Sequence, residues 1–278
     1  MYFPKDIYSL RKVYKYVIQN NYDYFIIGKG TNLVIDECYF NKVFINLKKL
    51  DQYFYLKDNK VLVLSGAFSS KIAYTLAKHK YTGCEFLSVI PGTIGGAVYM
   101  NAGAYNNQMS DIIDSVLIID NDGHLKLIKN NECGFAYRYS NFKKEKNIIL
   151  GTILKLKKVD NEKIPLEKIR LYVSNKKDNQ PLNAKSAGST FLNPKGVQAW
   201  ELIDKIGYRG KVFGGAKVSE KHANFLINHN HASFSDIYNL MLEITLNVKN
   251  HCNIDLECEW EILKWQNINL FCLLPIHN

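Results

Sequence analysis

The sequence predicts a globular protein of the α+β class. Its 278 residues are 47% hydrophobic and 22% charged, which are values typical of folded domains and not of disordered chains. Some segments place apolar residues at helical spacing, and others alternate or run as short apolar stretches typical of strands. Strands and helices follow one another too irregularly for a doubly wound sheet.

The first part of the chain is expected to hold more strands than helices. Apolar positions at helical spacing predict a helix over 6–20, and a second helix over 69–83 is expected to be closed by Gly83 as a C-terminal cap. Two apolar runs joined through Asn121, Asp122 and Gly123 predict a hairpin over 114–128. Further strands are expected within 22–28, 30–36, 42–47, 60–67 and 147–159.

A lysine-rich stretch at 160–183 is expected to form a helix and then a loop, and it places the domain junction near residue 160. The pattern beyond it predicts helices over 196–207 and 233–252, with strands near 214–219, 223–228 and 255–263. We therefore expect a first domain over 1–160, a second over 161–264, and a C-terminal extension over 265–278.

Charge and cysteine content limit the possible partners. The formal net charge is +10 and the sequence pI is near 9.1, which favours anionic partners. No nucleic-acid-binding motif, secretory signal or bilayer-spanning run is visible, so a cytoplasmic protein with reduced thiols is expected. His229 and His231 are spaced like metal ligands, but nothing nearby completes a set, and no metal site is expected.

Two glycine-rich segments indicate a ligand that approaches the backbone closely. Residues 88–105 read SVIPGTIGGAVYMNAGAY, and residues 28–33 read GKGTNL after a predicted strand. The segment 28–33 does not match a dinucleotide-binding fingerprint, because Leu33 stands where the third glycine is needed. It does not match a Walker A loop either, because Asp23 stands where the first glycine of that motif is needed. Turns of this kind form concave anion sites, to which Thr31 and Asn32 add short polar side chains. Tight packing turns are the alternative.

The second half carries its own polar constellation. Residues 186–194 (SAGSTFLNP) surround Gly188 with hydroxyl and amide side chains, and residues 214–228 (GGAKVSEKHANFLIN) add basic groups. On a strand, Glu257, Glu259 and Glu261 would face one side. Either that face is solvated or one of these acids enters a site.

The ordered motifs resemble one enzyme family. GCEFLSVIPGTIGGAVYMNAGAY, YRYS, QPLNAKSAGSTFLNP, GGAKVSEKHANFLIN and LECEWEIL occur in this order between about residues 7 and 264. Together they resemble UDP-N-acetylenolpyruvoylglucosamine reductase (MurB), in the compact form that lacks an extra substrate loop. The resemblance implies a two-part FAD-binding fold of the vanillyl-alcohol oxidase type, followed by a C-terminal α+β substrate-binding domain. It also implies noncovalent FAD, NADPH as hydride donor, and reduction of UDP-N-acetylglucosamine enolpyruvate to UDP-N-acetylmuramate in peptidoglycan precursor synthesis.

The same resemblance assigns roles to individual residues. Arg138 is expected at the substrate carboxylate, Ser189 as proton donor, and Glu259 as a group that stabilises the intermediate. Substrate binding is expected from Tyr137, Asn193, Lys217 and His222. The residues expected to hold FAD are Gly28, Lys29, Gly30, Thr31, Asn32, Leu33, Pro91, Gly92, Thr93, Gly95, Gly96, Ala97, Asn101, Gly103 and Ala104. The expected partners are a UDP-sugar and NADPH, with no nucleic acid, membrane or obligate protein partner.

The sequence also departs from the family pattern. Family members usually begin with a few dozen further residues, so either a missing opening strand would weaken one side of the FAD-binding fold or the start of the sequence is mis-assigned. Cys258 stands for a proline and Glu261 for an arginine around the retained Glu259, and NKKDNQP carries lysines where arginine is common. Lysine keeps the charge there but not the bidentate geometry.

Two other functions remain open at this level. An FAD-dependent oxidase on the same fold would explain the glycine segments but not Arg138, Ser189 and Glu259 together. A basic module that binds nucleic acid is allowed by the net charge of +10, but it does not require the ordered glycine motifs.

Overall fold

The structure is a computed structural model of the whole chain, and it describes residues 1–38, 40–145 and 147–264. The chain divides into two compact units. Unit 1 comprises Met1–Thr31 and Lys42–Asn183, and unit 2 comprises Asn32–Asn41 and Ala184–Asn278. The expected extension over 265–278 lies outside the described residues.

Unit 1 is built on a five-stranded antiparallel sheet with strand order β10-β9-β11-β5-β4. Its strands are β4 (Tyr53–Tyr55), β5 (Lys60–Leu64), β9 (Ile113–Ile119), β10 (Leu125–Lys129) and β11 (Ile148–Lys155). The β9–β10 pair confirms the predicted hairpin, with Leu125 opposite Ile119. Shorter pairs accompany this sheet: β1 (Tyr24–Ile27) with β3 (Val43–Asn46), β6 (Tyr81–Thr82) with β12 (Lys157–Lys158), and β7 (Gly103–Ala104) with β8 (Asn107–Gln108). The N-terminus joins unit 1 because the backbone of Tyr2 bonds to Phe44 and Asn46 on either side of an isolated bridge.

The helices of unit 1 are α1 (Ile7–Gln19), α2 (Ser69–Lys78), α3 (Ile94–Tyr99) and α4 (Lys163–Asn179). Single-turn 3₁₀ helices are η1 (Glu85–Val89), η2 (Met109–Asp111), η3 (Asn130–Glu132) and η4 (Asn141–Lys143). Helix α1 buries the apolar face that its spacing predicts, including Leu10 and Tyr14, and Asp6 caps its first turn. The expectation that Gly83 closes the second helix is wrong. Helix α2 ends at Lys78, Lys80 adopts a left-handed φ of 63°, and β6 starts the pairing with β12 before Gly83 is reached.

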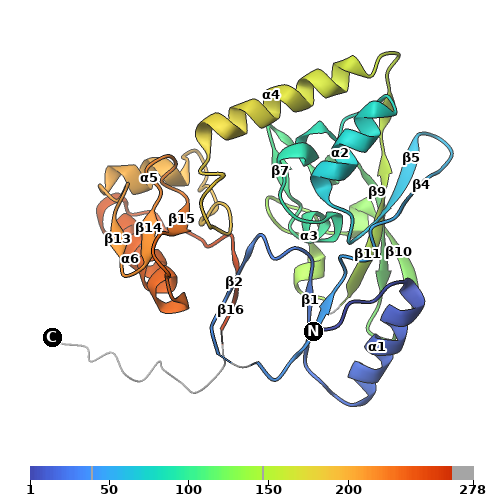
Figure 1. Cartoon of the computed structure of the whole chain (residues 1–278), viewed down its shortest axis with the longest axis horizontal. Coiled ribbons are helices and arrows are strands. Elements are labelled where there is room, and N and C mark those ends of the chain that lie inside the picture. Colours follow the sequence, from blue (N-terminus) through green and yellow to red (C-terminus); the bar gives the residue numbers. More distant parts are fainter. Residues whose placement is uncertain (39, 146, 265–278) are drawn as a thin grey trace. The chain divides into compact units, whose positions relative to one another are not determined.

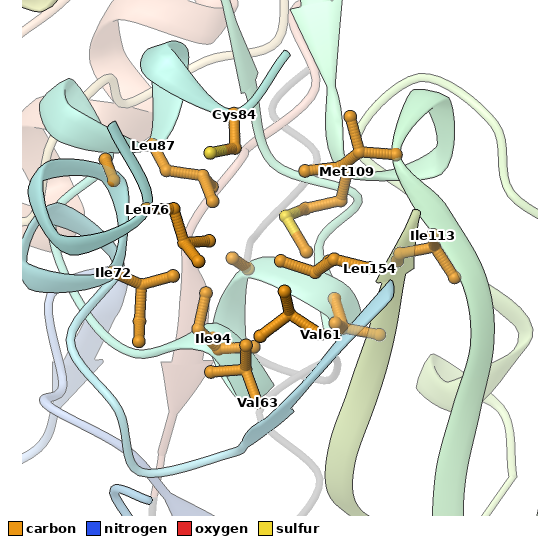
Figure 2. Packing of buried hydrophobic residues seen from close by; sticks show 14 of the residues in the cluster. Val61, Val63, Ile72, Leu76, Cys84, Leu87, Ile94, Met109, Ile113 and Leu154 are labelled. Carbon is orange, nitrogen blue, oxygen red and sulfur yellow. The ribbon is translucent and has the colours of Figure 1, made fainter. Parts of the chain in front are cut away.

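The core of unit 1 lies between its helices and the sheet. Figure 2 shows Ile72, Leu76 and Ile94 from the helices facing Val61 and Val63 from β5. All five side chains are almost fully buried, and each contributes about 1.5–3 kcal/mol of hydrophobic free energy relative to an exposed side chain. Because α3 packs here, the glycine-rich segment around it is held by the core.

Helix α4 belongs to unit 1, which moves the division between the units to residue 183 from the expected boundary near residue 160. Ile169 and Tyr172 are buried in the same cluster as α2. The Tyr172 ring stacks on Tyr105, with 4.1 Å between centroids. Lys176 donates to the carbonyl of Val89 at 2.6 Å, and burial lowers the pKa of this amine. The lysine-rich composition of the segment concealed this buried face.

In the part of unit 2 that the structure describes, a small antiparallel sheet is combined with two helices and one parallel strand pair. Its sheet has the order β13-β14-β15. Helix α6 is preceded by a capping box at Ser233 and followed by the C-cap residue Asn253, whose φ is 56°. Figure 1 shows β2 and β16, which come from distant parts of the sequence, running side by side. The elements are β2 (Leu33–Ile35), α5 (Ala199–Lys205), β13 (Val212–Phe213), β14 (Ala216–Val218), β15 (Leu226–Asn228), α6 (Phe234–Cys252) and β16 (Glu261–Leu263).

The thiols of unit 1 are unreactive because they stay protonated. Burial raises the pKa values of Cys84 and Cys133 to about 12, so both remain protonated at neutral pH. No cysteine among the described residues forms a disulfide. Within the described ranges, none of the helices has the length and apolar composition that crossing a bilayer requires.

Candidate active site

The two glycine segments of unit 1 lie against each other. The Thr31 hydroxyl donates to the carbonyl of Pro91 at 3.2 Å. A Cβ on Gly28 would lie 2.4 Å from the Thr93 hydroxyl, and one on Gly92 would lie 2.8 Å from the Thr31 hydroxyl. Segments about 60 residues apart in the sequence therefore approach so closely that neither position accommodates a larger side chain.

Backbone donors collect in this place. Gly92 has a φ of +108°, the left-handed region that favours glycine. Ile94 and Gly95 donate their N–H groups to the carbonyls of Ala67 and Ser65. By contrast, no acceptor from the described residues is found for the N–H groups of Gly92, Thr93 and Gly96. A glycine turn with unused backbone donors suits the oxygens of a pyrophosphate, so the residues present fit FAD.

The YRYS motif forms a two-residue turn in unit 1. Ala136 and Tyr139 exchange backbone hydrogen bonds of 3.0 and 3.1 Å, which leaves Tyr137 and Arg138 at the tip. Arg138 has a φ of 53°, a conformation that costs a non-glycine residue about 1–3 kcal/mol. Its guanidinium donates to the carbonyl of Gly103 at 2.8 Å and lies 5.0 Å from the centre of the exposed Tyr137 ring. Such local strain is typical of functional sites.

Asn101 lies beside this turn and was expected near the cofactor. Its side chain is fully buried and is engaged within the chain, because its amide nitrogen donates to Ala136 and Gln108 and its oxygen accepts from the N–H of Ser110. Any contact that Asn101 makes with a cofactor is therefore left to its backbone.

Unit 2 brings the backbone segments of Ser189 and Glu259 side by side. The backbone of Glu259 donates to the carbonyl of Thr190 at 2.9 Å, and Phe191 forms an antiparallel bridge with Cys258. Ser189 precedes Thr190, so its backbone lies one position from the residue that pairs with Glu259. Both residues are partly buried, whereas Glu257 is exposed. The strand predicted over 255–263 is irregular up to Trp260, apart from the bridge at Cys258, and the regular strand is β16.

Asn32, the first residue of unit 2, contacts this segment within the same unit. The chain passes from unit 1 to unit 2 between Thr31 and Asn32. The Asn32 side chain donates to the carbonyl of Glu259 at 3.0 Å, and its carbonyl accepts from Glu261. Leu33 begins β2 opposite Glu261. Both residues were expected at FAD, and the structure gives them contacts around Glu259.

Sequence reasoning missed Asn224. This buried residue accepts from the N–H of Phe191 at 2.9 Å and donates back to the Phe191 carbonyl at 2.8 Å, while its own carbonyl accepts from Thr190. These bonds fix the segment that follows Ser189. The available signal was an asparagine inside the apolar run ANFLIN, because a buried amide needs partners.

The residues expected to bind substrate have different surroundings. Asn193 accepts from the first N–H of α5 and donates to Gln198, so it organises a helix start. Lys217 pairs with Glu220 at 2.7 Å. The ring of His222 accepts from the N–H of Asn224 at 3.3 Å, and burial lowers the pKa of this imidazole. His222 therefore belongs to the Ser189 neighbourhood, whereas the Asn193 amide is occupied locally.

One group of metal-ligating side chains lies outside these sites. Asp120, Asp122 and His124 come close together in the β9–β10 turn, within the described part of the chain. The Lys126 ammonium pairs with Asp120 at 2.6 Å, and backbone N–H groups of the turn bond to the same carboxylate. Lys126 holds the pKa of Asp120 well below its usual range, near 2. This cluster is a stabilised turn.

Comparison with known families defines first the class of protein. Residues 1–128 match an FAD binding domain, in agreement with the glycine turns of unit 1. The chain is thus an FAD-dependent oxidoreductase, and the expected α+β class with an N-terminal FAD-binding part is confirmed.

Residues 180–263 match the C-terminal domain of UDP-N-acetylenolpyruvoylglucosamine reductase. The chain is 38% identical over 248 residues to the reductase of that name from Caldanaerobacter subterraneus, with 89% of this chain and 82% of the relative covered. It is 37% identical over 266 residues to the one from Clostridium tetani, with 96% and 86% covered. The crystal structure of MurB from Thermus caldophilus superposes with a TM-score of 0.79 at 30% identity, covering 94% of this chain and 91% of that one. The chain belongs to the UDP-N-acetylenolpyruvoylglucosamine reductase (MurB) family, which acts on small-molecule substrates in peptidoglycan precursor synthesis.

Proposed function

We propose that this chain reduces UDP-N-acetylglucosamine enolpyruvate to UDP-N-acetylmuramate, with NADPH as hydride donor and Ser189 as proton donor. The observation that supports these roles most is the pairing of Thr190 with Glu259. It brings the backbone segments that carry Ser189 and Glu259 side by side within unit 2. Family membership supports the substrate class.

FAD, if held by the glycine turns of unit 1, would supply the hydride chemistry that links NADPH to the terminal carbon of the enolpyruvyl group. When that carbon gains the hydride, the electron pair of the double bond moves to the neighbouring carbon and its carboxylate. Arg138 stabilises this developing charge, because the planar guanidinium matches a carboxylate in bidentate geometry. Donors that are ordered before the reaction stabilise the transition state without a reorganisation cost.

Ser189 then completes the reduction. Its hydroxyl proton passes to the carbon beside the carboxylate, and a C–H bond forms there as the enolate collapses. A hydroxyl is a weak acid, so the serine oxygen needs help as it loses the proton. Glu259 provides this help by sharing a proton with Ser189. Hydride and proton together account for the two hydrogens gained by the substrate.

The remaining candidates serve substrate binding. Lys217 leaves its ion pair with Glu220 and binds the anionic nucleotide instead. Tyr137 presents an exposed ring to the substrate at the tip of the Arg138 turn. His222 is held neutral by its lowered pKa and acts by hydrogen bonding. The proposed substrates are soluble nucleotides, and the reaction needs no nucleic acid, membrane or obligate protein partner. We place it in the cytoplasm.

We propose that FAD is held without a covalent bond. The glycine segments that fit it carry no cysteine or histidine, and the adjacent Cys84 is buried as a thiol with a pKa raised to about 12. Denaturation of the yellow protein should release all of its colour. Colour that remains on the precipitated chain would overturn this part of the proposal.

The test is a coupled assay on the purified protein. It should be yellow and should consume NADPH only when the enolpyruvyl sugar nucleotide is present. An oxidase on the same fold would consume oxygen without that substrate. A nucleic-acid module would be colourless, and its binding would fall steeply with salt. Either of these two results would reject the proposed reaction.

A further inference from the structure

We propose that Asn101 is a positioning residue for Arg138: it holds the turn that carries the guanidinium and acts on the reaction only through it. This inference rests on the proposed function, because it assigns a purpose to Asn101 only if Arg138 stabilises the developing charge. Asn101, Gly103 and Arg138 all belong to unit 1.

Residues 99–103 run along the Arg138 turn and contact it at alternating positions. The carbonyl of Tyr99 accepts from the Ser140 hydroxyl at 2.7 Å. The Asn101 amide donates to the carbonyl of Ala136 at 2.8 Å. The carbonyl of Gly103 accepts from the Arg138 guanidinium at 2.8 Å. The first two bonds fix the two ends of the turn, and the third aims the side chain at its tip.

In two of these contacts, residues 99–103 contribute a backbone carbonyl. In the third, the bond to Ala136, they contribute the Asn101 side chain. An asparagine amide offers two N–H donors and a carbonyl oxygen. The donors reach Ala136 and the Gln108 side chain, and the oxygen accepts from the N–H of Ser110 at 2.9 Å. The residue is fully buried, so no water replaces a lost bond. Asn101 thereby ties the Arg138 turn to β8 and η2.

The backbone conformations of the two residues support the same role. Asn101 and Arg138 have φ values of 42° and 53°. Asparagine tolerates this left-handed region better than most residues, whereas an arginine there is strained. A strained turn persists only where its surroundings over-determine it. The bonds that Asn101 makes to Ala136 and Ser140 makes to Tyr99 provide that restraint. Without the Asn101 bond the turn can relax, and the Arg138 guanidinium then moves from its position.

Residues 99–103, which contact the Arg138 turn, also follow the glycine-rich run directly. Gly95 and Gly96 lie in α3, which ends at Tyr99, and Asn101 follows within two residues. The core packing of Ile94 and Val98 therefore anchors both the backbone donors and the segment that orders Arg138. A displacement of about 1 Å at a reacting group can lower a rate about 10²-fold.

The test uses Asn101→Gly and Asn101→Asp. Glycine adopts the same φ without strain but removes the amide. Aspartate keeps the size and the acceptor for Ser110, but an ionised carboxylate cannot donate to Ala136, so it remains usable if the glycine variant does not fold. Both variants should retain FAD and bleach with NADPH at the normal rate. Reoxidation of the reduced flavin by the enolpyruvyl substrate should slow by about 10- to 100-fold.

The decisive measurement is a double-mutant cycle with Arg138→Ala. If Asn101 acts through Arg138, its loss should change reoxidation less than threefold once Arg138 is absent. The matched control is Asn130→Gly. Its amide also donates to two backbone carbonyls, those of Ser110 and Ile113, both at 2.8 Å. It should shift the unfolding temperature without the kinetic effect of the Asn101 variants.

The outcomes separate the two proposals. An Asn101 effect of equal size with and without Arg138 would overturn the positioning role while leaving the proposed reaction intact. Normal reoxidation rates in both Asn101 variants would overturn the positioning role as well. If Arg138→Ala itself left reoxidation unchanged, the proposed role of Arg138 would fall, and the role of Asn101 with it.

Discussion

The N–H of Glu259 donates to the carbonyl of Thr190 at 2.9 Å and joins two segments far apart in the chain. Through this bond the segments that carry Ser189 and Glu259 lie side by side within unit 2. The Asn32 side chain reinforces the arrangement because it donates to the Glu259 carbonyl at 3.0 Å. These two bonds fix the backbone of Glu259 against its neighbouring segments.

Ser189→Ala should separate the two half-reactions. NADPH does not meet the proton that Ser189 supplies, so flavin bleaching should keep its normal rate. Reoxidation by the enolpyruvyl substrate should slow by about 10²- to 10⁴-fold, the contribution of a positioned general acid. Ser189→Cys should retain some activity because a thiol also donates a proton. Stopped-flow absorbance measures each half separately.

The control for Ser189 is Ser186→Ala. Ser186 is exposed and accepts a long 3.4 Å bond from Gly188, so its loss should have a much milder effect. Slow bleaching by NADPH with normal reoxidation in Ser189→Ala would contradict the proton-donor assignment.

Arg138→Lys should keep the charge but lose the planar fork. Turnover should fall by about 10²-fold, as for loss of a preorganised charge-stabilising donor, with a smaller change in KM. Steady-state kinetics separate the two parameters. The control is Arg170→Lys on an exposed position of α4. A variant that raised KM alone would make Arg138 a binding residue.

Glu259→Gln should lower turnover because the amide cannot share a proton with Ser189. Its effect should appear in reoxidation and not in bleaching, as for Ser189. Glu257→Gln, two residues earlier and exposed, is the matched control and should behave like the unmodified protein. Equal losses in the two variants would show that general charge, and not the position of Glu259, determines the rate.

Gly92→Ala should weaken FAD binding. The new Cβ would meet the Thr31 hydroxyl at 2.8 Å and force the two glycine segments apart. Gly123→Ala provides the comparison, because its φ of +82° imposes similar backbone strain in open space. That strain costs about 1–2 kcal/mol in either variant. Flavin titration should therefore reveal a loss in Gly92→Ala alone, and equal affinities would exclude a cofactor role for this contact.

The imidazole of His222 should make unit 2 sensitive to mild acid. Burial lowers its pKa in the folded state, so between the folded pKa and about 6.5 the unfolded chain binds the proton more readily. The free energy of unfolding should fall as the pH drops through this window and level off below the folded pKa. His222→Gln should flatten the Tm profile, whereas the exposed His251→Gln should not. A profile unchanged by His222→Gln would contradict this account.

Local patterns were sufficient for much of the fold. Apolar spacing located α1, α6 and the β9–β10 hairpin, because each buries one face and carries its own start and turn signals. The glycine segments and the Arg138, Ser189 and Glu259 motifs were also visible in the sequence, since their residue types are chemically distinctive.

Long-range contacts decided the remainder. Neither the early end of α2 nor the packing of α4 on unit 1 follows from local composition, because strand pairing at β6 and burial of Ile169 and Tyr172 determine them. Residues 32–41 join unit 2 because β2 pairs with β16, more than 220 residues later in the chain. The positioning roles of Asn101 and Asn224 depend on the backbone carbonyls of Ala136 and Phe191, which the fold places next to them. A side-chain pattern predicts which groups are available, but only the folded chain determines which backbone atoms they meet.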